Sequence, residues 1–178
     1  KRVGGSLLKQ AVEDVREYGA FLLLSGTKNP LLSPVQPSAA TGVRRRETIF
    51  ASFDDPSFGH WTTKGKAFQR PRGGTMPDQN PVTGFLGGGL VNSYDPNDEP
   101  QGRMTSPVFV IQEKYISFLV GGGRHPDQCC INLVIDGKVV RSSTGKNTEN
   151  LKREEWDVSE FANREARIEL VDERSDGW

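Results

Sequence analysis

The chain has 178 residues, 34% of them hydrophobic and 26% charged, so it is long enough for one full domain and too short for two large ones. Lys plus Arg and Asp plus Glu both number 23, which gives a formal net charge of zero and no general basic field that would attract nucleic acid. No stretch approaches ~18 uninterrupted apolar residues, so we expect no membrane span.

The first 46 residues differ in pattern from the rest of the chain. The start is not a signal peptide, because its apolar run is too short, and the chain begins without Met, so we expect a piece of a larger protein. Residues 6–24 predict an amphipathic helix with Ser6 as its N-cap. Residues 25–46 hold three prolines among small residues and predict a linker. We therefore expect residues 1–46 to end a preceding domain and a second domain to cover 47–178.

From residue 47 onward the pattern changes to short alternating runs separated by Gly and Pro, which predicts strands. The predicted strands are 48–53, 66–69, 89–93, 103–111, 114–120, 130–136, 138–143, 153–158 and 165–172. Asp136-Gly137 between two strand runs predicts a type I′ hairpin turn. Segment 114–120 is nearly all apolar, as expected for a strand buried on both faces.

Many short strands without intervening helices favour antiparallel layers over parallel β-α-β units. We therefore predict an all-β, jelly-roll-like antiparallel β-sandwich, preceded by one amphipathic helix and a Pro-rich linker. Trp156 and Trp61 are expected to contribute to its core, since aromatic side chains dominate core area. Trp178, at the chain end, is left unassigned.

The sequence shows no catalytic constellation. His60 and His125 are the only histidines, and no Gly-x-Ser-x-Gly elbow accompanies them. The two cysteines, Cys129 and Cys130, are adjacent, so a bridge between them would be strained and no disulfide framework or zinc pattern exists. On a strand they would point to opposite faces, one buried and one partly exposed.

Two glycine triplets, 87–89 and 121–123, could cradle phosphate, but neither continues as a P-loop into a helix. The better interpretation is a tight bend or the close approach of a ligand to the backbone. Arg124 and His125 follow the second triplet, and we expect them at a loop tip with their donors facing outward. The sequence thus favours a turn here over nucleotide binding.

Acidic clusters admit two interpretations, a structural calcium ion or solvated turn residues. One cluster is the 95–99 segment, whose ligand-type residues lack EF-hand spacing. The other is Asp54, Asp55 and Asp172, which would come together if the first and last strands of the sandwich pair. We name Asp54 and Asp172 as the metal ligands on that interpretation.

Eight segments occur in the order typical of carbohydrate-binding module family 66, the non-catalytic modules attached to levanase-type glycoside hydrolases of family 32, and residues 50–178 resemble these modules. The matching segments are Phe53–Asp55 with Trp61, Gly65–Phe68, Gly89–Ser93, Met104–Pro107, Ile116–Gly123, Ile131–Gly137, Trp156–Val158 and Ala166–Asp172 running to Trp178. Such modules usually continue past Gly-Trp with one more strand, which we expect to be missing from this chain because it stops at Trp178.

The resemblance implies a jelly-roll-like sandwich that binds the terminal fructose of fructans and leaves hydrolysis to a neighbouring domain. It implies that an early acidic residue, an arginine soon after it and a later polar loop grip the sugar hydroxyls in charge-assisted hydrogen bonds. In this chain, the ligand-binding residues that the resemblance implies are Asp54, Asp55, Arg70, Arg72, Arg124, His125 and Asp127.

Three functions stay open on the sequence. The first is a carbohydrate-binding module of a secreted, periplasmic or cell-surface protein, such as the large secreted bacterial proteins in which similar modules occur. Its expected partners are a fructan or another glycan and a neighbouring domain of the same chain, without nucleic acid. The second is a structural or protein-interaction sandwich without sugar binding. The third is a hydrolase on the same fold, which would need two carboxylates facing each other across a cleft.

Overall fold

The computed structural model describes residues 22–25 and 47–177 of the chain. Its strands are β1 (Leu22–Ser25), β2 (Glu47–Ala51), β3 (Thr62–Gly65), β4 (Gly102–Thr105), β5 (Phe109–Val110), β6 (Tyr115–Gly122), β7 (Cys129–Ile135), β8 (Lys138–Thr144), β9 (Thr148–Asp157) and β10 (Glu165–Asp172). A 3-10 turn, η1 (Ser159–Phe161), joins the last two strands. The described residues contain no helix long and apolar enough to cross a membrane.

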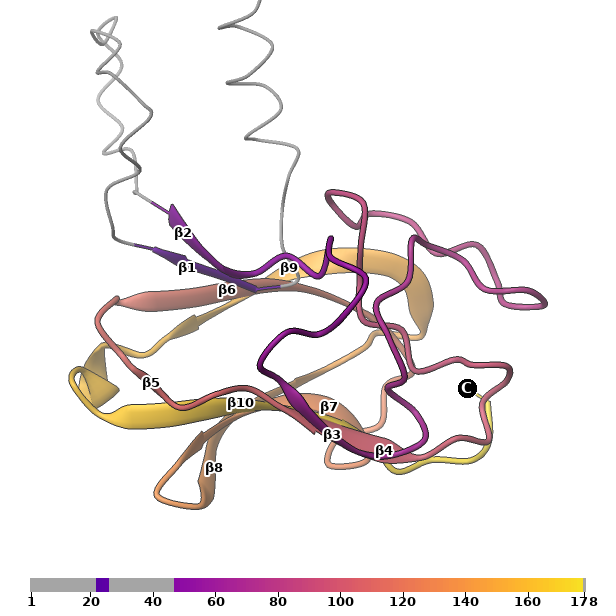
Figure 1. Ribbon diagram of the computed structural model, residues 1–178. Helices are drawn as coiled ribbons and strands as arrows, with labels where there is room; N and C mark the ends of the chain where they lie inside the picture. The colour runs from indigo at the N-terminus through magenta and orange to yellow at the C-terminus, as the bar shows by residue number, and fades with distance from the viewer. Residues whose placement is uncertain (1–21, 26–46, 178) are drawn as a thin grey trace, which may run out of the picture.

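The strands form two layers that face each other (Figure 1). One sheet has the order β2-β1-β6-β9, and the other has β3-β4-β10-β7-β8 with β5 paired to β10. Every strand pair is antiparallel. The all-β antiparallel sandwich is therefore confirmed, whereas its jelly-roll topology stays a prediction.

The core lies between the two layers. Its largest fully buried side chains are Phe118, Met104, Ile116, Leu133, Ile168 and Val158. Phe118 of β6 packs edge-on against Trp156 of β9, with ring centroids 4.6 Å apart. Trp156 is buried as predicted, and Trp61 is half-buried against Phe50 and Phe53 at the margin of the core. The alternation of β10 is also confirmed, because Ala166, Ile168 and Leu170 are all buried.

Local turn chemistry explains the β7–β8 hairpin. Asp136 and Gly137 both have positive φ, 50° and 73°, as a type I′ turn requires. Within the predicted strand 114–120, three consecutive residues, Ile116, Ser117 and Phe118, are all buried, which agrees with a strand covered on both faces.

Several predicted elements are wrong in ways that tertiary contacts explain. Residues 66–69 are not a strand, because the chain bends at Gly65 (φ 87°) and the N–H groups of Lys66 and Ala67 both donate to the Gln101 carbonyl. Within 89–93 only Leu90 pairs, in an isolated bridge to Arg72. The 103–111 run is divided into β4 and β5 around Pro107, which has no N–H to continue a ladder.

The predicted helix does not extend to residue 24. Residues 22–25 form β1, which lies between β2 and β6. This apolar run is therefore paired in a sheet and does not continue the predicted helix. Residues 6–21 of the predicted helix and 26–46 of the predicted linker lie outside the described residues. The division into two domains at residue 46 stays a prediction.

Candidate functional site

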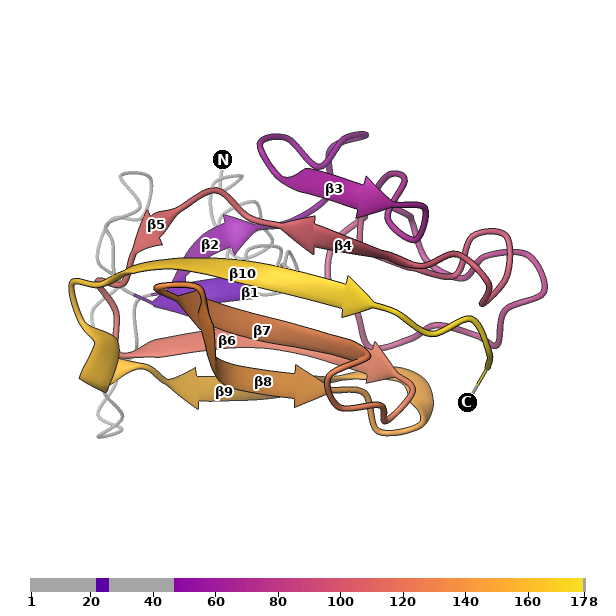
Figure 2. The same cartoon turned by 90° about the horizontal axis from the view of Figure 1, so that it is seen from below.

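A cavity of about 160 Å³ opens at one end of the sandwich. It lies where β6 and β10 end and β7 and β9 begin, and the irregular segment 66–101 contributes its other wall. That segment and the described C-terminal residues lie at the same end of the molecule (Figure 2). A cavity of this size holds on the order of ten water molecules, comparable with the volume of one sugar ring.

Glycines form one wall of the cavity. Gly121, Gly122 and Gly123 line it directly, and Gly122 adopts φ 100°, which a residue with a side chain rarely adopts. A Cβ on Gly145 would lie 2.1 Å from the Gly122 carbonyl oxygen. The 144–147 turn can therefore approach the Gly122 backbone this closely only because Gly145 has no side chain. The second glycine triplet therefore ends β6 at an irregularity in its pairing with β9, beside the cavity, rather than forming the predicted turn.

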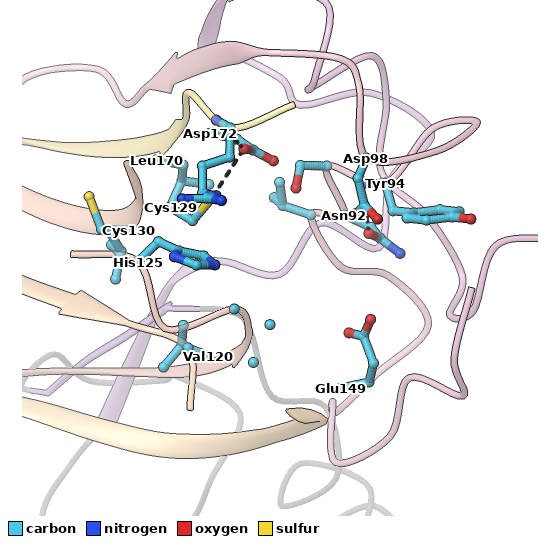
Figure 3. A pocket seen from close by; sticks show the side chains of 18 of the residues that line it. Asn92, Tyr94, Asp98, Val120, His125, Cys129, Cys130, Glu149, Leu170 and Asp172 are labelled. Atoms are coloured by element: carbon cyan, nitrogen blue, oxygen red, sulfur yellow. Dashed lines mark hydrogen bonds between the residues drawn. The ribbon is translucent and has the colours of Figure 1, made fainter. Parts of the chain in front are cut away.

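Neutral and acidic polar groups form the opposite wall. Asn92 and Gln79 bond to each other twice: the Asn92 amide donates to Gln79 Oε1 at 2.8 Å, and the Gln79 amide donates to Asn92 Oδ1 at 3.3 Å. Gln79 Nε2 also lies 3.5 Å from Glu149 Oε1. These amides hold Glu149 at the start of β9, where Figure 3 shows its carboxylate across the cavity from His125.

The third wall comes from β7 and β10. Cys129 donates its thiol hydrogen to Asp172 Oδ1 at 3.2 Å. Burial, with the nearby Asp172 charge second, raises the pKa of the Cys129 thiol to about 12. Arg174 forms an ion pair with Asp176 and donates to Gln128 Oε1 at 3.2 Å, and its Nε has no hydrogen-bond partner among the described residues. Cys130 is buried and Cys129 partly exposed, as predicted.

His125 faces the cavity (Figure 3). Its backbone N–H donates to Thr144 Oγ1 at 3.1 Å, and its carbonyl accepts from the Cys129 N–H at 2.8 Å, so the loop around it is fixed. The ring Nε2 is buried and has no hydrogen-bond partner in the described part of the chain. The prediction that this side chain faces outward is wrong, because it points into the molecule beside the cavity.

The carboxylates at the cavity influence one another. Loss of hydration raises the pKa of Glu149, with the charge of Asp98 adding to the effect and the Gln79 hydrogen bond opposing it. Loss of hydration also raises the pKa of Asp98, which lies at the exposed rim, and the charges of Asp172 and Asp176 raise it further. The cavity thus concentrates negative charge.

The structure places the early predicted site residues outside the cavity lining. Asp54 accepts a 2.8 Å hydrogen bond from the Gly88 N–H, so it anchors the first glycine triplet. Asp55 and Arg70 are exposed. Arg72 is buried in an ion pair with Asp95, where burial, then the charge of Arg70, lowers its pKa.

The later predicted residues divide into two groups. His125 and Asp172 both line the cavity. Arg124 and Asp127 belong to the same loop but are exposed and do not line it. Asp127 has φ 69°, and the Arg124 N–H donates to Asn147 Oδ1 at 2.7 Å, so both positions shape the turn.

The premise of the second predicted metal cluster is wrong. β2 pairs with β1, and β10 lies between β4 and β7, so the first and last strands of the sandwich do not pair. Asp54 is bonded to the Gly88 backbone and Asp172 to Cys129. Within residues 22–25 and 47–177, no group of three or more His, Cys, Asp or Glu side chains is arranged to hold a metal ion.

Most of the cavity residues were not predicted as site residues, among them Gln79, Asn92, Asp98 and Glu149. Asp98 belongs to the acidic 95–99 segment and Asn92 to a segment of the family resemblance, so each carried a signal without a role. Gln79 and Glu149 carried no signal in the sequence, because a contact between residues 70 positions apart brings them together.

The chain is similar to part of a longer fungal protein. A protein of Aspergillus rugulosus described as "Putative glycosyl hydrolase ecdE" is 44% identical over 119 residues, which make up 66% of this chain and 17% of that protein. This relative is fungal, whereas the family resemblance included bacterial proteins. No family model matches the chain, and no solved structure matches it. The chain is thus a β-sandwich related to one segment of a protein described as a glycosyl hydrolase.

Proposed function

We propose that the sandwich is a non-catalytic carbohydrate-binding module and that the cavity holds one terminal sugar residue. The observation that carries the proposal is a preformed space at the end of the sandwich, lined by a glycine wall and by side chains able to bond hydroxyls. Binding sites for small molecules are typically concave, largely preformed and equipped with a few convergent polar groups.

The chemistry of the walls suits a sugar. The carboxylates of Glu149 and Asp172 can accept hydrogen bonds from hydroxyl groups, and the unpartnered Nε2 of His125 adds one more polar contact. Apolar side chains, among them Val120 and Leu170, face the same space and can pack against the C–H groups of a sugar ring. Tyr94 stands at the outer rim (Figure 3), where an extended glycan would pass.

The similarity to a segment of a protein described as a glycosyl hydrolase supports the same function. We propose that the module directs a neighbouring domain of a secreted or cell-surface protein to its glycan. The fructan resemblance makes terminal fructose the first neutral ligand to test. We propose that the cavity residues contact the sugar, in place of Asp54, Asp55, Arg70 and Arg72.

Calorimetric titration with fructose, levan and a panel of other glycans tests the proposal. We expect binding of at least one glycan, weakened about tenfold or more by His125→Ala, which removes a cavity group worth about 1.4 kcal/mol. His60→Ala is the matched control, because His60 is exposed and outside the cavity lining. Equal affinity of the two variants, or no binding by the folded protein, would overturn the proposal, and the latter would favour a protein-interaction sandwich.

Glycoside hydrolysis is the second candidate function. The raised pKa of the Glu149 carboxyl, caused by lost hydration and by the charge of Asp98, favours it, because a raised carboxyl pKa is typical of a general acid. Chromatography of the glycans after prolonged incubation separates the two functions. The binding module predicts that they are recovered unchanged, and released sugar that is lost in Glu149→Gln would establish the hydrolase instead.

A further inference from the structure

The charges around the cavity are unbalanced. Its charged lining residues are Asp98, Glu149, Asp172, Asp176 and Arg174, that is, four carboxylates and one guanidinium. The guanidinium already forms an ion pair with Asp176. The cavity therefore carries an excess of negative charge that no described lining side chain neutralises.

Two of the three remaining carboxylates have polar but uncharged hydrogen-bond partners. Glu149 is bonded to the neutral amide of Gln79. Asp172 accepts from the Cys129 thiol and from the Arg174 backbone N–H at 3.3 Å. Neither of them, nor Asp98, forms an ion pair with a residue in the described ranges. Charges in such a partly dehydrated space interact more strongly than in bulk water, so a cation there would gain from all three.

We infer that the cavity selects sugars that carry a protonated amine over neutral sugars, and neutral sugars over those that carry a carboxylate. An ammonium group has three donors and no acceptor, which suits a space bordered by Asp98, Glu149 and Asp172. The unpartnered His125 Nε2 is a further acceptor when the imidazole is neutral. The inference rests on the proposed carbohydrate binding and names the chemical class of the sugar.

The pKa values of two rim groups support this order of preference. The carboxyls of Asp98 and Glu149 both have a raised pKa, through lost hydration and neighbouring carboxylates. A positive charge stabilises their ionised forms, whereas a ligand carboxylate adds to the repulsion.

Matched sugars that differ at one substituent test the inference. The intact protein is titrated with EDTA present, at about pH 6.5, where the amine of an amino sugar is protonated. The probes are glucosamine, N-acetylglucosamine, glucose and glucuronic acid, with the corresponding galactose series and 1-amino-1-deoxyfructose beside fructose. We expect the amine to bind at least about tenfold more tightly than the neutral sugar, N-acetylation to abolish that gain, and the carboxylate to be rejected.

Two variants and one control locate the effect. Asp98→Asn should reduce the preference for the amine while neutral sugar still binds, and Glu149→Gln should weaken both ligands but the amine more strongly. Asp78→Asn, an exposed change outside the cavity lining, should leave the preference intact. Neutral sugar bound as tightly as the amine overturns this inference but leaves carbohydrate binding standing, whereas silence toward every sugar overturns both. Amine binding that requires added calcium would also overturn it.

Discussion

Arg72 shows how one buried charge can be mistaken for a ligand contact. A basic residue soon after the first acidic pair fits the expected sugar-gripping pattern, yet its side chain is 8% exposed and paired with Asp95. Its backbone also forms the bridge to Leu90. The guanidinium therefore ties the 66–101 segment together rather than facing a ligand.

Replacing Arg72 should destabilise the fold. Arg72→Ala leaves the partly buried Asp95 carboxylate without its partner, and removing one member of a buried pair typically costs about 3–5 kcal/mol. Urea unfolding should show a loss of that order in the free energy of unfolding. Arg70→Ala, exposed two residues away, should change it by less than about 0.5 kcal/mol, and equal effects of the two changes would contradict the ion-pair role.

Cys129 should be unreactive while the protein is folded. Its thiol pKa of about 12 leaves on the order of a thousandfold less thiolate at pH 8 than an ordinary thiol has. In a Cys130→Ser background, reaction with a thiol-specific chromogenic disulfide should be slower by about that factor than in guanidinium chloride. Rapid modification of the folded protein would contradict the Cys129–Asp172 hydrogen bond.

The same thiol predicts how stability changes at high pH. Because the folded state holds the proton to about pH 12 and the unfolded thiol releases it near pH 8.5, the unfolded state binds fewer protons between these values. Stability from this group is therefore complete below about pH 8.5 and declines toward pH 12. A Cys129→Ser variant should lose this part of the alkaline decline.

At the residue scale, His125 and Asp172 of the predicted site residues reach the cavity. His125 adjoins a glycine triplet, which is a local signal, whereas Asp172 was named as a metal ligand on a strand pairing that does not occur. Gln79 and Glu149 could not be predicted, since their roles arise only when segment 66–101 folds over β9. The outward orientation expected of His125 failed for a related reason: the Thr144 hydroxyl, 19 positions away, fixes its loop.

At the element scale, the contact between two turns shapes the cavity. The 144–147 turn lies against the end of β6, where Asn147 N donates to the Gly122 carbonyl at 2.9 Å. This close approach depends on Gly145, which has no side chain to separate the two backbones.

Gly145→Ala should therefore disturb both stability and binding. The new Cβ would meet the Gly122 carbonyl oxygen at 2.1 Å and the Gly123 carbonyl oxygen at 2.8 Å, so one backbone must shift. We expect a loss of roughly 2–3 kcal/mol in the free energy of unfolding, in the range of overpacked sites. Gly73→Ala is the matched control, because its nearest contact would be an ordinary 3.6 Å. Equal stability of the two variants would contradict the close approach.

Elements were predictable where their signal is local. The β7–β8 hairpin follows from Asp136-Gly137 and flanking alternation, and β10 (Glu165–Asp172) agrees with its predicted range. The runs 66–69 and 89–93 have strand-like composition but no continuous partner, and whether a partner exists is decided by distant parts of the chain. The split of β4 from β5 follows from Pro107, a signal that the sequence did contain.

At the scale of the whole molecule, the two sheets share one core and leave a cavity where their ends diverge. Alternation and turn residues predict the antiparallel layers, because each strand must bury one face. They do not predict which strands are neighbours. The metal cluster of Asp54 and Asp172 was expected on the assumption that the first and last strands pair, and those strands do not pair. The cavity is a property of strand order and of loop 66–101 together.

A backbone NMR titration of the intact, isotope-labelled protein with the tightest-binding sugar of the panel decides whether the cavity is the sugar site. The proposed cavity site predicts that the largest saturable shifts fall on the cavity residues, especially Gly122, His125 and Glu149. The backbone amides of Asp55 and Arg70, outside the cavity lining, should shift little. Largest shifts at Asp55 and Arg70 with an unchanged cavity, or no saturable shift with any sugar, would contradict it.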